Sequence, residues 1–285
     1  MSKAFDEVGV VGAGLMGAEI ALMHALAGCR VRLVDRTSDA LTAALTRLGT
    51  LMDRGIARGL FTAAQKSLAF SAITPATELG ALRDCSYVTE AVFEDVQVKA
   101  DIWARLDAIC GEACIFASNT STIPISTLAS KVSAARQGAF IGTHYFSPVS
   151  RMQLVEVIPG FRTAEDTVTA TLEHCRRLGK VPIRVKDVAG FAVNRMLHAF
   201  IIEAVRLVEE NVATPEDIDT ACRLGLGHPL GPFELMDAVT STLCVQAQEI
   251  MQDAYGERFR PPPLLKQRVE AGFGGGKGKP GWRTR

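Results

Sequence analysis

A histidine and a glutamate, each at the end of or within an apolar run, are the strongest candidates for acid–base chemistry. His144 lies in the run at residues 141–146, and Glu156 lies in the run at residues 152–158. If a turn centred on Ser150 joins two antiparallel strands, the two side chains are cross-strand partners on one face. A carboxylate against one imidazole nitrogen fixes the tautomer, and the other nitrogen takes a proton near neutral pH. By itself the pair is also compatible with a structural histidine and a solvated edge charge.

A glycine-rich turn (residues 12–17, GAGLMG) lies between an apolar run and an Ala/Leu-rich helical segment. In a turn of this type the first glycine permits the tight bend, the second admits a pyrophosphate, and the third lets helix and strand pack closely. The N-terminus of the helix then attracts the phosphates. The turn therefore predicts a dinucleotide site made of Gly12, Gly14, Leu15, Met16 and Gly17.

The end of the next predicted strand, residues 30–34, indicates which dinucleotide binds. Asp35 follows that strand, at the position where a carboxylate accepts hydrogen bonds from an adenosine ribose. This favours NAD over NADP. Arg36 comes next and is able to approach a ribose 2′-phosphate, so NADP remains the alternative.

A run of small polar residues, 118–121 (SNTS), ends the strand expected at residues 113–118. Open α/β sheets bind ligands at the carboxyl ends of their strands. We therefore expect Ser121 to hydrogen-bond the substrate or the nicotinamide, and Asn119 to lie on the cofactor side. The same run is also typical of a helix N-cap before Pro124.

The elements that must position these groups alternate between strand and helix. The pattern predicts an α/β fold: a Rossmann-like doubly wound sheet with a helical hairpin, broken at Gly55 and Gly59, inserted after the second strand. Beyond residue 186 only helical patterns remain, so we expect domains at residues 1–185 and 186–285, the second all-α. The expected strands are 8–12, 30–34, 84–91, 113–118, 141–146 and 152–158; the expected helices are 18–27, 38–66, 96–110, 191–210, 215–223 and 232–251.

Composition limits the possible partners of the 285-residue chain. Thirty-one basic and 31 acidic side chains cancel, so no overall field favours nucleic acid or an anionic membrane. The most apolar stretch, residues 188–208, carries too many charges to span a bilayer. The seven cysteines form no C-x-x-C pair or zinc-type spacing, and no export signal is visible at the start. We expect reduced thiols, no metal and a cytoplasmic protein.

These motifs resemble those of the L-3-hydroxyacyl-CoA dehydrogenase family, and especially its 3-hydroxybutyryl-CoA type. The resemblance covers nearly the whole chain. It implies a reversible, NAD-dependent oxidation of a (3S)-3-hydroxyacyl-CoA to a 3-oxoacyl-CoA in fatty acid β-oxidation. The similar stretches are the glycine turn with Asp35, residues 89–94 with Lys99, 118–121, 144–148, 154–156, 190–195 and 228–234.

The resemblance also implies roles for individual residues. His144 abstracts the hydroxyl proton and Glu156 orients it, while Ser121 and Asn194 bind the reacting end of the substrate. The inserted hairpin is similar to the family's coenzyme A contact region, where basic side chains either meet phosphates or are simply solvated. A homodimer through the C-terminal helices is implied as well. The expected cofactor contacts are Glu94, Lys99 and Ser147, and the basic hairpin residues are Arg54, Arg58 and Lys66.

Two positions depart from the family pattern. Ser147 stands where many members have asparagine, which shortens a contact on the cofactor side, and residues 238–242 (AVTST) replace the usual Gly-Leu-Asp run. An apolar stripe on residues 196–208 suits either a core or a subunit interface. The competing functions are a related dehydrogenase of a free hydroxyl compound, of the gulonate or carnitine type, and an NAD-binding protein without catalysis.

Overall fold

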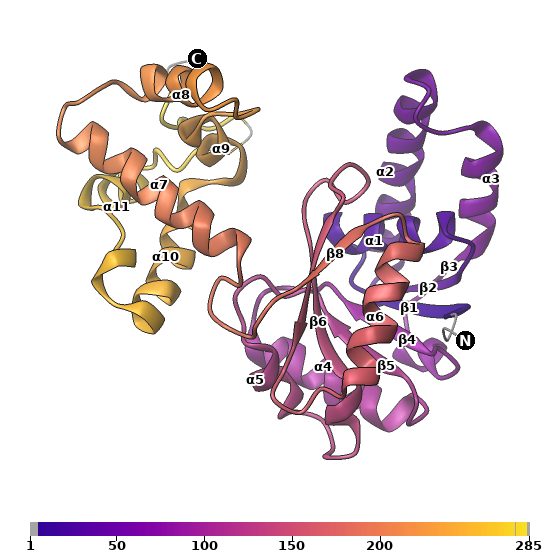
Figure 1. The fold of residues 1–285 in the computed structure, drawn as a ribbon. Helices are drawn as coiled ribbons and strands as arrows, with labels where there is room; N and C mark the ends of the chain where they lie inside the picture. Colours follow the sequence, from indigo (N-terminus) through magenta and orange to yellow (C-terminus); the bar gives the residue numbers. More distant parts are fainter. Residues whose placement is uncertain (1–4, 277, 284–285) are drawn as a thin grey trace. The chain divides into compact units, whose positions relative to one another are not determined.

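The computed structural model describes residues 5–276 and 278–283 of the chain (Figure 1). The chain divides into two compact units, one ending at Val188 and the other beginning at Ala189. Within the described residues, no helix is long and apolar enough to cross a membrane.

An eight-stranded sheet forms the centre of the first unit, in the order β3-β2-β1-β4-β5-β6-β7-β8. Neighbouring strands are parallel except β6 and β7, which form an antiparallel hairpin. The predicted doubly wound sheet is confirmed, although β3 and β8 were not predicted. The strands are β1 (Glu7–Val11), β2 (Arg30–Val34), β3 (Ile73–Ala76), β4 (Tyr87–Glu90), β5 (Ile115–Ser118), β6 (Phe140–Tyr145), β7 (Leu154–Pro159) and β8 (Val181–Arg184).

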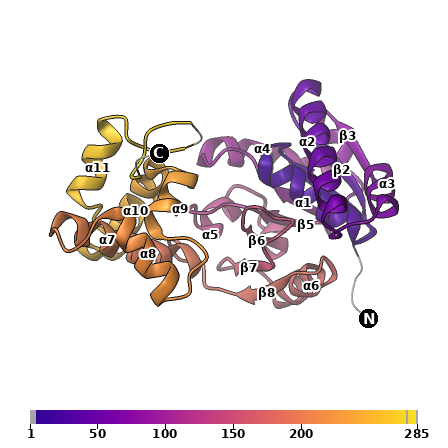
Figure 2. The same ribbon diagram turned by 90° about the horizontal axis from the view of Figure 1, so that it is seen from above.

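Helices cover both faces of this sheet, and α4 and α6 lie on opposite sides of the strands (Figure 2). On one face α1 and α6 pack on a core of Val, Leu and Ile side chains. On the other face Trp103 of α4 stacks on Phe116 of β5, with ring centroids 5.0 Å apart. The helices are α1 (Leu15–Leu26), α2 (Ser38–Ala57), α3 (Ala63–Ala72), α4 (Val96–Ile109), α5 (Ile125–Ala129) and α6 (Glu165–Arg177).

The predicted hairpin after β2 is present as α2 and α3, but one of its expected breaks is not. Gly55 lies inside α2, where a Cβ atom would come within 2.3 Å of the Phe61 ring. This glycine is therefore required by close packing and does not end the helix. Gly59, with φ of +71°, lies in the turn between the helices. Thr62 then begins α3 through a capping box with Gln65.

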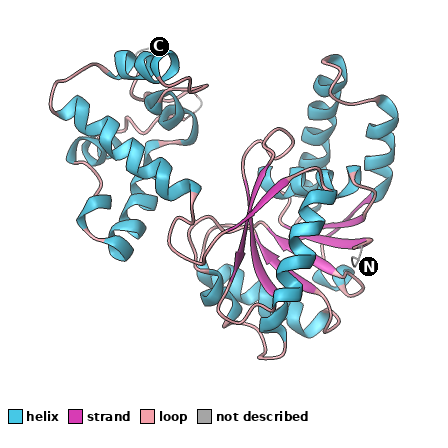
Figure 3. Ribbon diagram, viewed as in Figure 1, coloured by secondary structure: helices cyan, strands magenta, loops and turns pink. Residues whose placement is uncertain are grey.

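The second unit contains helices and loops but no strand among its described residues (Figure 3). Ile201, Val205, Phe233 and Trp282 contribute to its core, so most of the apolar stripe on α7 is core. The single helix predicted at residues 232–251 is two helices, because Thr240 has φ of +95°. The helices are α7 (Val193–Glu209), α8 (Pro215–Gly225), α9 (Pro232–Val239), α10 (Ser241–Tyr255) and α11 (Pro263–Glu270), of which α11 was not predicted.

Candidate active site

The β6–β7 hairpin places His144 directly opposite Glu156, as the sequence predicts. His144 Nδ1 lies 2.8 Å from Glu156 Oε2. His144 is 5% exposed and Glu156 is completely buried. A buried carboxylate needs a partner, and this one has the imidazole. With Nδ1 facing the carboxylate, Nε2 is the nitrogen that is directed elsewhere.

Ser121 lies on that other side of the imidazole. Its Oγ is 3.0 Å from His144 Nε2, although 23 residues separate the two in the sequence. Ser121 follows β5 and His144 is the last residue but one of β6, and these strands are parallel neighbours, so both residues lie at the carboxyl edge of the sheet. The structure thus brings together Ser121, His144 and Glu156, three of the four predicted catalytic residues. Asn194, the fourth, is the second residue of α7 in the other unit.

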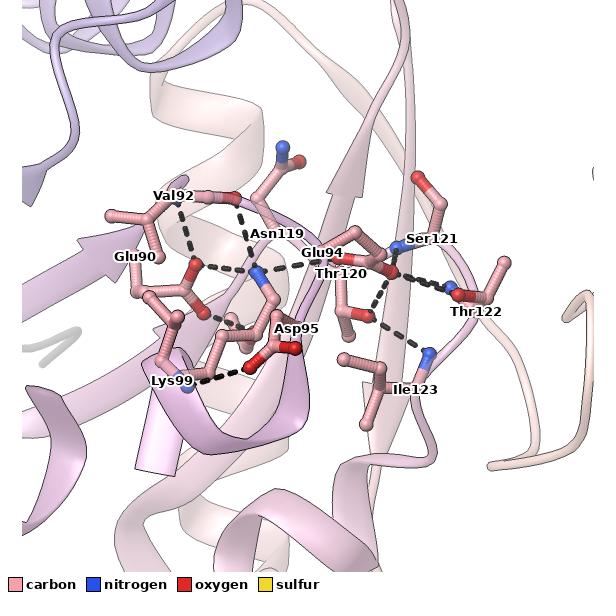
Figure 4. A network of polar contacts seen from close by, with 12 residues as sticks. Glu90, Val92, Glu94, Asp95, Lys99, Asn119, Thr120, Ser121, Thr122 and Ile123 are labelled. Atoms are coloured by element: carbon pink, nitrogen blue, oxygen red, sulfur yellow. Dashed lines mark hydrogen bonds and ion pairs between the residues drawn. The ribbon is translucent and has the colours of Figure 1, made fainter. Parts of the chain in front are cut away.

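Glu94 holds the loop that carries Ser121 (Figure 4). Its Oε1 accepts hydrogen bonds from Thr120 Oγ1 at 2.5 Å, from Ser121 N at 2.8 Å and from Thr122 N at 2.9 Å. Burial raises the pKa of the Glu94 carboxyl, but the charge of Lys99 and these hydrogen bonds outweigh it and lower the pKa. Glu94 is therefore an ionised clamp on residues 120–122.

Lys99 is fully buried beneath this clamp. Its Nζ lies 2.5 Å from Glu90 Oε1 and 3.3 Å from Glu94 Oε2. Glu90 also accepts from Ser118 Oγ at 2.7 Å, so the network joins the ends of β4 and β5. Because its ammonium is enclosed, a contact between Lys99 and a cofactor stays a prediction that requires this network to open. Sequence reasoning gave Glu90 no role; an acidic residue at the end of an apolar strand was the available signal.

The glycine turn is tightly packed at two of its glycines and open at the third. Gly12 has φ of +101°, and a Cβ on Gly17 would come within 1.9 Å of Gly12 O, so both positions need glycine. A Cβ on Gly14 would meet no atom within 4 Å, and no side chain caps the start of α1 there. The first amides of α1, at Leu15 and Met16, begin a helix whose N-terminus favours an anion.

Asp35 lies beside the same turn. Its Oδ2 accepts a hydrogen bond from Ala13 N at 2.6 Å, and its Oδ1 accepts from Arg36 N at 2.7 Å. The Arg36 side chain is exposed. Sequence reasoning missed Arg47 of α2, whose Nη2 donates to Ala13 O at 2.8 Å. The amide N–H and the carbonyl oxygen of Ala13 are thus both held by side chains. The ribose contact of Asp35 stays a prediction.

The remaining predicted residues occupy varied positions. Asn119 Oδ1 accepts from Tyr145 N at 2.9 Å and so ties β5 to β6. Ser147 is exposed in the turn after β6. Arg54 on α2 and Arg58 at its C-cap are exposed, whereas Lys66 pairs with Asp53 at 2.6 Å. Residues 271–276 and 278–281 contain no helix or strand, and residue 277 lies outside the described residues.

Comparison with known proteins covers both units. Residues 7–188 match the family described as "3-hydroxyacyl-CoA dehydrogenase, NAD binding domain", and residues 190–284 match its C-terminal domain. A 3-hydroxybutyryl-CoA dehydrogenase of Mycobacterium tuberculosis is 38% identical over 287 residues, 100% of both chains. The mitochondrial hydroxyacyl-coenzyme A dehydrogenase of Sus scrofa is 38% identical, over 92% of this chain and 85% of that protein.

A solved structure is also similar. The (S)-3-hydroxybutyryl-CoA dehydrogenase from Ralstonia eutropha superposes with a TM-score of 0.94 and 36% sequence identity, over 99% of this chain and 100% of that one. The likeness therefore extends across both units and every element that carries a candidate site residue.

Proposed function

This chain belongs to the 3-hydroxyacyl-CoA dehydrogenase family, and we propose that His144 is the base of its reaction. The enzyme is an NAD-dependent oxidoreductase that interconverts a 3-hydroxyacyl-CoA and a 3-oxoacyl-CoA. We propose the 3S stereochemistry for the hydroxyl carbon. The observation that carries the assignment of His144 is its place between Glu156 and Ser121, with one ring nitrogen facing each.

His144 Nε2 is the atom that takes the hydroxyl proton. Glu156, against Nδ1, keeps Nε2 unprotonated before the reaction and stabilises the imidazolium that forms. Ser121 Oγ, 3.0 Å from Nε2, marks where an oxygen atom is held in hydrogen-bond range of the base. Bound NAD would supply the hydride acceptor for C3, and the glycine turn with Asp35 would hold it. In the reverse direction the imidazolium returns the proton to the oxygen of the 3-oxo group.

The residues around the glycine turn are suited to NAD. The open side of Gly14 and the uncapped start of α1 accept a pyrophosphate, and Asp35 is placed to accept from ribose hydroxyls. We propose Asn119, Glu94, Lys99 and Ser147 as the residues that shape the nicotinamide side. Exposed Arg36 is the residue through which NADP would bind. A comparison of the KM values for NADH and NADPH therefore tests the assignment of NAD as the cofactor.

The coenzyme A end of the substrate is assigned to the hairpin. Arg54 on α2 and Arg58 at its C-cap are exposed, where they are available to phosphates, and Asn194 of α7 is proposed to bind the reacting end of the substrate. If the hairpin arginines bind phosphates, Arg54→Ala with Arg58→Ala raises the KM for the thioester and leaves the KM for NADH unchanged. Equal KM values for the thioester would contradict this assignment.

A homodimer through the helical unit is supported by apolar side chains that the chain alone leaves exposed. Leu224, Leu226 and Leu243 are 83%, 64% and 57% exposed. Single exposed leucines are ordinary, but several on one small helical unit favour an interface. Light scattering should give twice the mass of the chain, and a monomer at micromolar concentration would contradict the proposal.

The seven free cysteines support a cytoplasmic location, which cell fractionation tests.

The experiment that tests the base uses acetoacetyl-CoA with NADH and follows NADH consumption. We expect turnover by the wild type and a loss of several orders of magnitude in His144→Gln, with NADH affinity and melting temperature nearly unchanged. An active His144→Gln variant would remove the proposed base. Free acetoacetate is the matched control substrate, because a dehydrogenase of free hydroxy acids would reduce it, whereas this enzyme should not. An NAD-binding protein without catalysis would consume no NADH at all.

A further inference from the structure

A carboxyl group near the end of the first unit holds the segment that follows Ser121. Asp187 is the last residue but one of that unit. Its Oδ1 accepts a hydrogen bond from Ile125 N at 2.7 Å, and its Oδ2 accepts from Ser126 N at 2.8 Å. Both carboxyl oxygens are therefore used, and they bind residues that lie far back in the sequence. Asp187 thereby fixes the start of α5.

The start of α5 depends on this distant group for its hydrogen bonds. Pro124 precedes the helix, and its side chain offers no capping hydrogen bond. The first amides of a helix have no acceptor within the helix, so an oxygen must come from another part of the chain. Asp187 supplies two such oxygens. Without them, the first turn of α5 loses its attachment to the segment that follows β8.

Ile125 passes this restraint to the strand that carries His144. Its side chain is completely buried. It lies so close to Gly142 of β6 that a Cβ at position 142 would come within 2.5 Å of the Ile125 Cδ1 atom. Gly142 precedes His144 by two residues, and alternate residues of a strand face the same side of the sheet. Ile125 is therefore packed on the face of β6 that carries His144.

The loop between β5 and α5 is thus held at both ends. Glu94 accepts hydrogen bonds from residues 120–122 at one end, and Asp187 accepts from the first amides of α5 at the other. The Ser121 Oγ atom on this loop lies 3.0 Å from His144 Nε2. A displacement of α5 would therefore move Ser121 relative to the imidazole.

We propose that Asp187 is a positioning residue for the reaction, which keeps Ser121 within reach of the substrate oxygen that His144 deprotonates. This inference rests on the proposed roles of His144 and Ser121. Asp187 acts through the backbone of α5. Asparagine at this position has only one acceptor oxygen, because its amide nitrogen is a donor and cannot bind a second N–H group. Sequence reasoning gave Asp187 no role, since it lies beside the expected domain boundary.

The test is a double-mutant cycle in the full-length protein, with acetoacetyl-CoA and NADH as substrates. We expect Asp187→Asn and Ser121→Ala each to lower kcat/KM for the thioester about tenfold, the effect of roughly one lost hydrogen bond. The KM for NADH should stay nearly unchanged. Because both changes act through one hydroxyl group, Asp187→Asn should cost less than about twofold more in the Ser121→Ala background. Additive losses, or wild-type kcat/KM in Asp187→Asn, would overturn the proposal.

The second unit offers a matched control. Asp219 also accepts from two consecutive amides at the start of a helix, from Phe233 N at 2.9 Å and from Glu234 N at 3.0 Å. Asp219→Asn should therefore lower the melting temperature but leave kcat/KM for the thioester within about twofold of the wild type. A tenfold loss in this control as well would mean that any loosened helix start impairs the enzyme, which contradicts a specific role for Asp187.

The same assays distinguish this inference from the assignment of the base. An active His144→Gln variant would overturn both. An inactive His144→Gln variant, together with additive losses at Ser121 and Asp187, would overturn only the positioning role. Wild-type kcat/KM in Ser121→Ala would overturn that role too, because the contact through which Asp187 acts would then contribute nothing. If Asp187→Asn fails to fold, Asp187→Ser, whose hydroxyl keeps one acceptor oxygen, takes its place in the cycle.

Discussion

At the scale of single residues, the site depends on one buried carboxylate having the right partner. Glu156 is fully buried, and its Oε2 lies 2.8 Å from the imidazole of His144. Burying such a group is costly without a partner, so its position is explained by the pairing. If His144 is the base, as we propose, the pairing also orients it, because Nε2, the nitrogen that faces Ser121, is then the one that takes the proton.

Replacing Glu156 by glutamine tests this orientation. The side chain keeps its volume, but a neutral amide neither selects the His144 tautomer nor stabilises the imidazolium. We expect kcat to fall by about 10²- to 10⁴-fold, the usual contribution of general acid–base catalysis. Steady-state kinetics with acetoacetyl-CoA and NADH measure it, and NADH affinity should stay within about twofold. Wild-type kcat in Glu156→Gln would show that His144 needs no orienting group.

The sequence allowed the dyad to be predicted but not the clamp around it. His144 and Glu156 follow from strand alternation about Ser150, which is local and needs no tertiary information. The bonds of Glu94 to Thr120 and Ser121 join positions 26 and 27 residues apart, in two different loops. Only the pairing of β4 with β5 in the folded sheet brings those loops together. A local sequence pattern therefore cannot predict this contact.

At the scale of elements, the turn between β6 and β7 sets the strand register that places His144 opposite Glu156. Lys180, 6% exposed, donates from Nζ to the carbonyl oxygens of Val149 and of Met152 within that turn. Glu19 Oε2 accepts from Ser150 N at 2.8 Å, so α1 holds the turn as well. The turn is thus fixed from two elements that are distant in the sequence.

Substituting Lys180 by methionine removes two charge-assisted hydrogen bonds and leaves two carbonyls without their donor. We expect the free energy of unfolding to fall by about 1 to 3 kcal/mol and kcat to fall, because the hairpin that pairs His144 with Glu156 loosens. Thermal melts and steady-state kinetics measure the two effects. Lys180→Arg is the matched variant, and it should recover part of both. A methionine variant as stable and as active as the wild type would mean that the turn is held without Lys180.

The edge strands show where strand prediction failed. β3 (ITPA) and β8 (VPIR) each contain a proline, which removes a ladder donor and argues against a strand. Both lie at the ends of the strand order, where one side of the strand has no partner and proline is tolerated. A sequence pattern cannot distinguish an edge strand with proline from a loop, whereas the inner strands, rich in valine and isoleucine, were predicted.

The junction of α9 and α10 contains a strained residue. Thr240 has φ of +95° and ψ of 133°, a conformation that a β-branched residue rarely adopts. We expect Thr240→Gly to raise the free energy of unfolding by up to about 1 kcal/mol, because the relief of about 1 to 3 kcal/mol of strain exceeds the loss of the cap on Leu243 N and the cost of a more flexible unfolded chain. Urea unfolding measures the change. A less stable glycine variant would show that the cap outweighs the strain.

At the scale of the whole molecule, both units bury histidines that resist protonation. His24 and His174 lie between α1 and α6, with His174 Nε2 3.1 Å from His24 Nδ1. Burial first, and then nearby positive charge, lowers the pKa of both, that of His174 to about 4. In the second unit burial alone lowers the pKa of His198 to about 4. An unfolded histidine has an ordinary pKa of about 6.5.

These lowered pKa values make the fold sensitive to acid in a defined range. As the pH falls below about 6.5 the unfolded chain binds protons that the folded chain does not, so the free energy of unfolding decreases until about pH 4. Each such histidine adds up to about 1.4 kcal/mol per pH unit. Urea unfolding at a series of pH values from 7.5 to 4.5, chosen to span roughly the titration range of histidine, measures the slope. A free energy that stays constant or rises over that range would contradict the prediction.

A variant distinguishes the contribution of the histidines to acid sensitivity from that of the carboxylates. The pKa of Glu94 is lowered, so its contribution to stability is lost only as the pH falls below the ordinary glutamate range. His198→Gln should therefore reduce the slope between about pH 6.5 and 5 in the unfolding of the helical unit and leave the loss below that range unchanged. Exposed His228→Gln is the matched control and should keep the wild-type slope. If both variants behave alike, burial of His198 is not the source of the acid sensitivity.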